Sequence, residues 1–177
     1  MSTYGINIWG DNNFFIEDGK VKINHANKPA IIDMVQKVRN EGFKGPLVLR
    51  LPHLAQKQID TLYSKFDNSI KEYNYKGTFN AVFPLKVNQY PNFLFPMLEN
   101  SAAYNYGLEA GSKAELFIAM AYNNDNAPIT VNGFKDKEMI HLGFIAKEMG
   151  HNITLTIEGL NELNTIVEVK NETSLPC

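Results

Sequence analysis

Lys86 is the residue whose setting points most clearly to chemistry, because it closes the apolar segment that begins at Phe79. Burying an ammonium without a partner is costly, and the usual response is a lowered pKa that leaves a neutral amine. A neutral lysine amine attacks carbonyl carbons and forms Schiff bases. The alternative is a lysine at the end of a strand whose charged head reaches back into water. The isolated segment leaves both interpretations open.

The segment 79–87 is predicted to be a buried parallel strand that delivers Lys86 to its carboxyl end. Alternation of side chains places Val82, Pro84 and Lys86 on one face, and both faces are mostly apolar. Pro84 donates no ladder hydrogen bond, but this is tolerable where pairing is about to stop. Barrels and doubly wound sheets bind their ligands at the carboxyl ends of parallel strands. Lys86 is therefore expected at a ligand-binding edge.

The sequence around and after Lys86 alternates between short apolar strands and helical segments, which is typical of parallel βαβ units. Strands are predicted at 79–87, 104–109, 129–132 and 153–157. The helices that follow them are predicted from about 91, at 112–122, at 136–149 and at about 160–170. These four strand–helix units indicate an α/β fold with a parallel sheet.

A small β/α segment is predicted before the first of these strands. Asp18-Gly19 separates two short apolar runs and predicts a β-hairpin. Pro29 opens a predicted helix that Gly42 ends. A short strand is expected at 46–50, and an amphipathic helix at 54–73.

Polar side chains end the later predicted strands, where a barrel places its chemistry. Glu109 ends the second strand, Asn132 the third and Glu158 the fourth. Glu109 either holds the Lys86 amine in its productive charge state or forms a structural salt bridge with it. For Asn132 a turn with the following glycine is favoured over a ligand contact. Glu158 has weaker support as a site residue.

Ser112 and Glu115 have the Ser-x-x-Glu spacing of a capping box at the start of a predicted helix. Local hydrogen bonds therefore explain Ser112, and the capping role is favoured over a catalytic one. The four histidines are scattered without the paired spacing of a zinc site. No metal ligands are predicted in this sequence.

The composition is that of an ordinary soluble globular protein, with 44% hydrophobic and 20% charged residues. A net charge of −2 gives no reason to expect nucleic acid or an anionic membrane as a partner. No apolar run approaches the ~20 residues that span a membrane, and the start of the chain lacks a signal peptide's apolar core. The cytoplasm is the expected location. The lone cysteine, Cys177, excludes an internal disulfide.

Four motifs of this chain resemble those of biosynthetic arginine decarboxylases, in the family's order and at plausible spacing. They are Tyr-Gly-Ile-Asn-Ile-Trp-Gly at 4–10, Phe-Pro-Leu-Lys-Val-Asn-Gln at 83–89, Gly-Leu-Glu-Ala-Gly-Ser-Lys-Ala-Glu-Leu at 107–116 and Val-Asn-Gly-Phe-Lys-Asp at 131–136. The resemblance runs from Tyr4 to about Leu163. The final segment does not reproduce the family's catalytic cysteine motif, so that role is not transferred to Cys177.

The resemblance implies an alanine-racemase-like fold, in which a (β/α)8 barrel is joined to a separate β-domain. A complete barrel takes ~250 residues, whereas this chain has 177. The chain therefore resembles the amino-terminal portion of such an enzyme. The expected fold is α/β, a partial (β/α)8 TIM-like barrel of about four strand–helix units preceded by a small β/α segment. Residues 1–76 are expected to form that leading segment, and residues 77–177 the first half of the barrel.

The resemblance also implies a cofactor, pyridoxal phosphate, held as a Schiff base on Lys86. Glu109 and Asn88 become candidate cofactor-binding residues, although for Asn88 a loop-capping role is favoured over a cofactor contact. The implied reaction is decarboxylation of L-arginine to agmatine and carbon dioxide, which feeds putrescine and spermidine synthesis. Arginine is then the small-molecule partner, the full-length protein is expected to be a homo-oligomer, and magnesium is implied by the resemblance alone.

Three parts of the implied machinery lie further along the chains of the family. They are the glycine-rich phosphate loop, the acid that faces the cofactor's ring nitrogen, and the residues that grip the guanidinium. Residues 1–177 alone are therefore expected to be inactive. The alternatives left open are a decarboxylase for another basic amino acid or for diaminopimelate, a non-enzymatic pyridoxal-phosphate-binding protein, and a truncated partner subunit.

Overall fold

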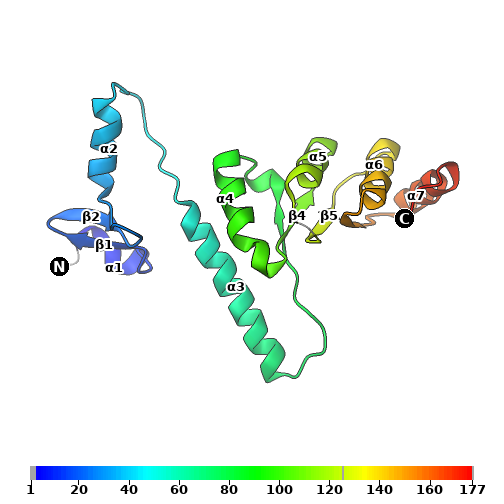
Figure 1. The fold of residues 1–177 in the computed structure, drawn as a ribbon, viewed down its shortest axis with the longest axis horizontal. Coiled ribbons are helices and arrows are strands. Elements are labelled where there is room, and N and C mark those ends of the chain that lie inside the picture. The colour runs from blue at the N-terminus through cyan, green and yellow to red at the C-terminus, as the bar shows by residue number, and fades with distance from the viewer. Residues whose placement is uncertain (1–2, 125, 177) are drawn as a thin grey trace. The chain divides into compact units, whose positions relative to one another are not determined.

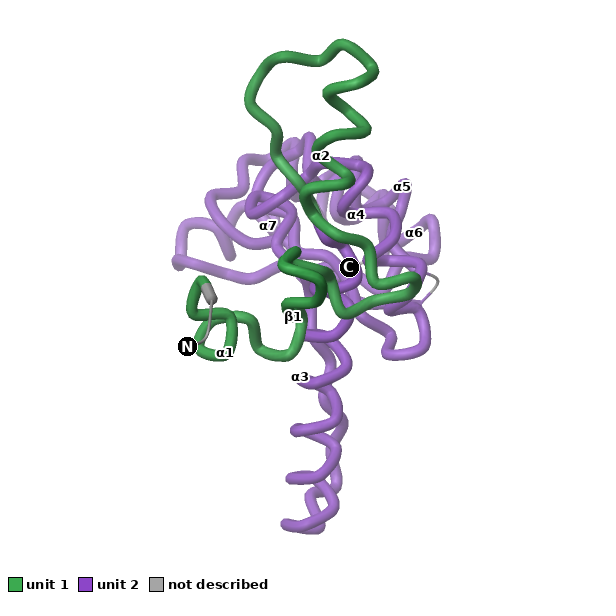
Figure 2. Tube along the Cα trace, turned by 90° about the vertical axis from the view of Figure 1, so that its left-hand side faces the viewer, with its two compact units in different colours: residues 1–50 green, residues 51–177 purple. Residues whose placement is uncertain are grey.

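The computed structural model describes residues 3–124 and 126–176, so that Cys177 lies outside the described residues. The chain divides into two compact units, residues 1–50 and 51–177 (Figure 2). The long helix α3 (Pro52–Glu72) belongs to the second unit. The boundary expected after residue 76 stays a prediction about where the barrel begins.

The first unit is built on the predicted β-hairpin. Its elements are η1 (Thr3–Gly5), α1 (Ile6–Trp9), β1 (Phe14–Glu17), β2 (Lys20–Ile23) and α2 (Ile31–Asn40). Strands β1 and β2 pair antiparallel, with Phe14 opposite Ile23. Asp18 and Gly19 form the two-residue turn with φ of 51° and 72°, the positive values that a type I′ turn requires. The hairpin prediction is confirmed.

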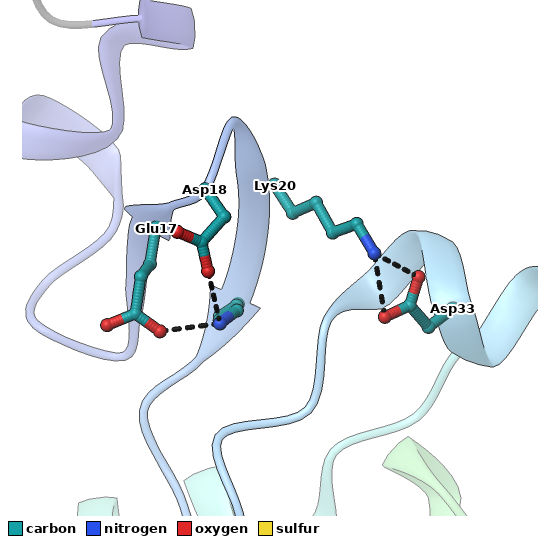
Figure 3. A network of polar contacts seen from close by, with 5 residues as sticks. Glu17, Asp18, Lys20 and Asp33 are labelled. Atoms are coloured by element: carbon teal, nitrogen blue, oxygen red, sulfur yellow. Dashed lines mark hydrogen bonds and ion pairs between the residues drawn. The ribbon is translucent and has the colours of Figure 1, made fainter.

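Ion pairs tie the hairpin together and to α2 (Figure 3). The Lys22 ammonium lies beside the carboxylates of Glu17 and Asp18, and Lys20 Nζ lies 2.8 Å from Asp33 Oδ1. The hydrogen bond to Glu17 raises the pKa of Lys22 above its usual value. Since most of these side chains are substantially exposed, each pair contributes little stability by itself.

The predicted helix before Gly42 is confirmed, but the predicted strand at 46–50 is wrong. Gly42 follows α2 with a φ of 93°, as expected of a residue that ends a helix. Residues 46–50 have no assigned secondary structure, and Val48 is among the exposed apolar side chains. A strand needs a neighbour for its backbone hydrogen bonds, and the described residues provide none for this segment.

The second unit contains a four-stranded parallel sheet flanked by helices (Figure 1). After α3 its elements are β3 (Val82–Pro84), η2 (Leu85–Val87), α4 (Pro91–Ser101), η3 (Ala102–Tyr104), β4 (Gly107–Ala110), α5 (Lys113–Tyr122), β5 (Pro128–Val131), α6 (Lys137–Glu148), β6 (Asn152–Leu155) and α7 (Leu160–Glu172). The strand order is β3-β4-β5-β6, and each neighbouring pair is parallel. The predicted βαβ units are confirmed, and the sheet is open, as in part of a barrel.

The core of this unit holds the strand ends in place. Leu108, Ile129 and Val131 on the central strands are fully buried, and so is Leu116 on α5. Helix α3 joins them through Tyr63, whose hydroxyl accepts a hydrogen bond from the Ala81 N–H at 3.2 Å. This packing fixes the start of β3 and therefore the direction in which the chain reaches Lys86.

Gly107 is required where β4 passes close to β5. A Cβ built at this position would lie 1.8 Å from the carbonyl oxygen of Pro128, closer than any real contact. Gly107→Ala is therefore expected to lower the free energy of unfolding by about 3 kcal/mol, because rigid backbone has to move. Urea unfolding followed by circular dichroism checks this. Gly159→Ala, which would meet nothing within 4 Å, is the matched control and should leave the midpoint nearly unchanged.

None of the helices in residues 3–124 and 126–176 combines the length and the apolar character needed to cross a membrane.

Candidate active site

Lys86 lies just past the end of β3, in the 3-10 turn η2, and not within a strand that continues to residue 87. The strand prediction was too long because Pro84 offers no N–H for further pairing, and the chain then turns. The turn is anchored by Leu85, which is fully buried. Lys86 nevertheless lies at the carboxyl end of a parallel strand, as the sequence predicted.

Glu109 is the charged partner that the structure places beside Lys86. Lys86 Nζ lies 3.6 Å from Glu109 Oε1. The strand register explains this, because Glu109 on β4 is paired with Pro84, two residues before the lysine. The two candidates named from the sequence are therefore brought together by neighbouring strands.

The expectation of a dry lysine amine is wrong for this chain. The Lys86 side chain is 65% exposed, whereas that of Glu109 is 16% exposed. The physical reason is the open sheet, in which β3 is an edge strand and has a neighbour on one side. The amine is therefore open to solvent in residues 51–177, and the Glu109 carboxylate lies beside it.

Asn88 has the loop-capping geometry. Its Oδ1 accepts a hydrogen bond from the Tyr90 N–H at 3.0 Å, immediately before helix α4. The contact fixes the loop between η2 and α4. The further role of Asn88 in binding a cofactor stays a prediction.

Glu115 does more than the predicted capping box requires. Its N–H donates to Ser112 Oγ at 3.2 Å, which confirms the role of Ser112 as a cap. Its carboxylate accepts from the Gly111 N–H at 2.6 Å and from Gln89 Nε2 at 3.1 Å. The contact with Gln89 was not predicted, because no local spacing signals a bond between residues 26 positions apart.

The turn after β5 joins the loop after β6. The Gly133 N–H lies 2.9 Å from Asn132 Oδ1 and 2.7 Å from Glu158 Oε1. Gly133 has a φ of 80°, so the turn interpretation of Asn132-Gly133 is confirmed. Glu158 reaches across to the neighbouring loop, which accounts for its polarity at this strand end.

Lys135 is a buried cation that the sequence did not single out. Its side chain is 0% exposed, and Nζ lies 2.9 Å from Glu162 Oε1 at the start of α7. Partial burial acts to raise the pKa of Glu162, but the backbone N–H of Glu158 and the Lys135 ammonium outweigh it, and that pKa lies below its usual value. A pocket of about 460 Å³ opens beside this pair, between the loops that follow β5 and β6.

Glu162→Gln is expected to destabilise the protein at neutral pH and to matter less in acid. A lowered pKa in the folded state contributes stability above the usual carboxyl pKa, and this is lost as pH falls through the folded value. The difference from the parent chain should be about 1 kcal/mol at pH 7 and should shrink below about pH 4. Thermal unfolding across pH measures it, with Glu168→Gln on the exposed part of α7 as control. A difference that stays constant down to pH 3 would contradict the assignment.

The described residues contain no group of three or more His, Cys, Asp or Glu side chains placed to hold a metal ion. The candidate site therefore consists of an amine, a carboxylate and the loops that carry them.

Comparisons with known proteins identify what this arrangement is similar to. No protein-family model matches the chain. It is 36% identical over 174 residues to the biosynthetic arginine decarboxylase of Prochlorococcus marinus strain MIT 9215, a match that covers 95% of this chain and 27% of that protein. It is 33% identical over 175 residues to the biosynthetic arginine decarboxylase of Rhodopirellula baltica, covering 96% of this chain and 26% of that protein.

Comparison with solved structures also finds a biosynthetic arginine decarboxylase. The crystal structure of the biosynthetic arginine decarboxylase from Campylobacter jejuni superposes with a TM-score of 0.93 at 63% identity, and covers 99% of this chain and 30% of that one. A diaminopimelate decarboxylase from M. jannaschi gives a TM-score of 0.64 at 24% identity over 92% of this chain and 34% of that one, and this likeness shows the fold alone.

The chain thus spans between a quarter and about a third of the length of the proteins it matches, from 26% to 34%. The predicted resemblance to a portion of a biosynthetic arginine decarboxylase is confirmed. The predicted fold class, part of an alanine-racemase-like barrel, is confirmed as well.

Proposed function

We propose that this chain is part of a pyridoxal-phosphate-dependent arginine decarboxylase, which converts L-arginine to agmatine and carbon dioxide for putrescine and spermidine synthesis. The similar proteins carry this enzyme's name and match nearly the whole chain. The observation that best supports the proposal is the approach of Lys86 Nζ to Glu109 Oε1, 3.6 Å apart at the carboxyl ends of β3 and β4. This is where a barrel presents its reactive groups.

The residues at this edge fit pyridoxal phosphate. An aldehyde needs an amine that it can reach, and the Lys86 side chain is 65% exposed on the open edge of the sheet. The Glu109 carboxylate is largely buried beside it and supplies the opposite charge. Asn88 Oδ1 accepts a hydrogen bond from the Tyr90 N–H, so this contact leaves the amide nitrogen for another partner. We propose that this nitrogen would bind the cofactor.

Lys86, Glu109 and Asn88 would each have a separate role in this enzyme. Bound pyridoxal phosphate supplies an electron sink for loss of the carboxylate as carbon dioxide. Lys86 would hold the cofactor through its Nζ, which is the amine that an aldehyde can reach at this edge. The Glu109 carboxylate, with its Oε1 3.6 Å from Lys86 Nζ, would hold the lysine side chain in place by ion pairing. Asn88 orients the loop that follows the lysine.

The remaining assignments accompany this proposal. Arginine is the small-molecule partner, and the full-length protein is expected to act in the cytoplasm as a homo-oligomer. No step is assigned to magnesium, because the described residues offer no cluster of metal ligands.

Trapping the cofactor on the chain tests the lysine assignment. Pyridoxal phosphate is added to the purified chain, borohydride is added at short times, and the labelled peptides are identified by mass spectrometry. Lys86 is expected to be labelled several-fold faster than Lys65, an exposed lysine on α3, because Lys86 lies at the carboxyl end of a parallel strand, where a barrel binds its ligand. Equal rates at the two lysines would contradict the assignment, as would a Schiff-base absorbance that survives unchanged in Lys86→Ala.

A further inference from the structure

We propose that Glu115 and Gln89 form a positioning pair that holds the Lys86 turn opposite Glu109. The inference rests on the proposed function, since it concerns how the proposed cofactor lysine is placed. Neither residue is assigned a direct part in the chemistry.

Glu115 is a buried anchor at the start of α5. The residue is 8% exposed, and its position is fixed by its own N–H on Ser112 Oγ. One carboxylate oxygen accepts the Gly111 N–H at 2.6 Å, in the turn that directly follows β4. Glu115 is therefore tied to the strand that carries Glu109, two residues before Gly111.

Gln89 connects this anchor to the other loop. Its Nε2 donates to the second carboxylate oxygen of Glu115 at 3.1 Å. Gln89 lies three residues after Lys86, between η2 and α4. The lysine turn is thus held before Lys86 by the buried side chain of Leu85 and after it by Gln89.

Helix capping alone does not account for this geometry. A cap needs the contacts within residues 111–115, whereas the bond to Gln89 crosses to a loop 26 positions earlier. A carboxylate accepting two N–H donors makes strong, charge-assisted hydrogen bonds. The carboxylate therefore couples the loop after β3 to the turn after β4, the two segments that must keep Lys86 and Glu109 close.

A swap of the two side-chain types tests the pair. In Gln89→Glu two carboxylates face each other, so the link is lost. In the double variant Gln89→Glu with Glu115→Gln, the new glutamine at 115 donates to the new glutamate and still accepts from the Gly111 N–H. Glu115→Gln alone keeps the link after the Gln89 amide turns over, and is the conservative control.

The experiment measures whether Lys86 stays in contact with Glu109, and no cofactor is added. A water-soluble carbodiimide joins an amine to a carboxylate that touches it, and the Lys86–Glu109 link is quantified by peptide mass spectrometry. The exposed ion pair Lys137–Glu172, 2.7 Å apart on α6 and α7, is the internal control for folding.

Gln89→Glu is expected to lower the Lys86–Glu109 yield by about tenfold or more, as for loss of a hydrogen bond to a charged group. The double variant should restore it, while the Lys137–Glu172 yield stays constant throughout. An unchanged yield in Gln89→Glu, or no recovery in the double variant, would overturn the inference. If the control link also falls, Gln89→Ala replaces Gln89→Glu, and the same fall is required of it.

Pyridoxal-phosphate labelling of the same variants separates this inference from the function it rests on. If Lys86 is labelled no faster than Lys65 even in the parent chain, the proposed function fails, while the cross-link yields still decide the positioning role. If Lys86 is labelled faster than Lys65 and the Lys86–Glu109 cross-link yield is the same in Gln89→Glu as in the parent chain, the proposed function stands and the positioning role is excluded.

Discussion

A chimera in which this chain replaces the matching segment of the Campylobacter jejuni enzyme is expected to release agmatine from arginine, and Lys86→Ala is expected to abolish that release. The backbone of this chain superposes on that of the Campylobacter jejuni enzyme with a TM-score of 0.93 at 63% identity, so the chain should pack in the place of the segment that it replaces. Removing the amine that we propose holds the cofactor would take away covalent catalysis, and kcat should fall by about a thousandfold or more.

Agmatine is measured by chromatography under saturating arginine and pyridoxal phosphate. Lys65→Ala, on α3, is the matched loss of an exposed lysine and should leave kcat within about twofold. Lys86→Arg keeps the positive charge beside Glu109 but cannot bond the aldehyde, so it should be as inactive as Lys86→Ala. Substantial turnover in Lys86→Arg would show that charge, and not covalent attachment, is the role of this residue.

The chain by itself is expected to produce no measurable agmatine, with a rate at least about a thousandfold below that of the chimera. The amine is 65% exposed and the sheet that carries it is open, so the substrate is neither oriented nor shielded from water. The family resemblance places the phosphate loop and the guanidinium site outside these residues. The assay incubates purified chain with pyridoxal phosphate and arginine, and circular dichroism verifies that it is folded.

Agmatine formation that is robust and depends on Lys86 would contradict this expectation. It would mean that the four strand–helix units carry a complete site, and the pocket of about 460 Å³ beside Lys135 and Glu162 would then be the first place to look for the substrate.

Much of the fold was predictable because its signals are local. Asp18-Gly19 specified the hairpin turn through positive φ values that few residues tolerate. Ser112 specified a helix start through a side-chain bond to an N–H three residues on. The prediction of a strand at 46–50 was wrong because strand formation is not local. An apolar run becomes a strand only when a neighbouring strand pairs with it.

The site was predicted in part. The sequence identified Lys86 and Glu109, and strand pairing brought them to 3.6 Å. It overestimated the burial of the lysine, because burial depends on what covers a strand edge and not on the apolar residues before it. The role of Gln89 was missed, because its partner Glu115 belongs to the next strand–helix pair, 26 positions further along the chain.

Local signals in the sequence specified the order of strands and α-helices from β3 to α7, the Ser112 helix cap, the hairpin turn and the lysine around which chemistry is proposed. Each depends on interactions within a few residues, which a sequence states directly. Three features became visible only once the strands and helices were packed: the exposure of Lys86, the link from Gln89 to Glu115 and the buried pair of Lys135 with Glu162. These depend on which strand lies beside which, and the free energy of that choice is spread over the whole core.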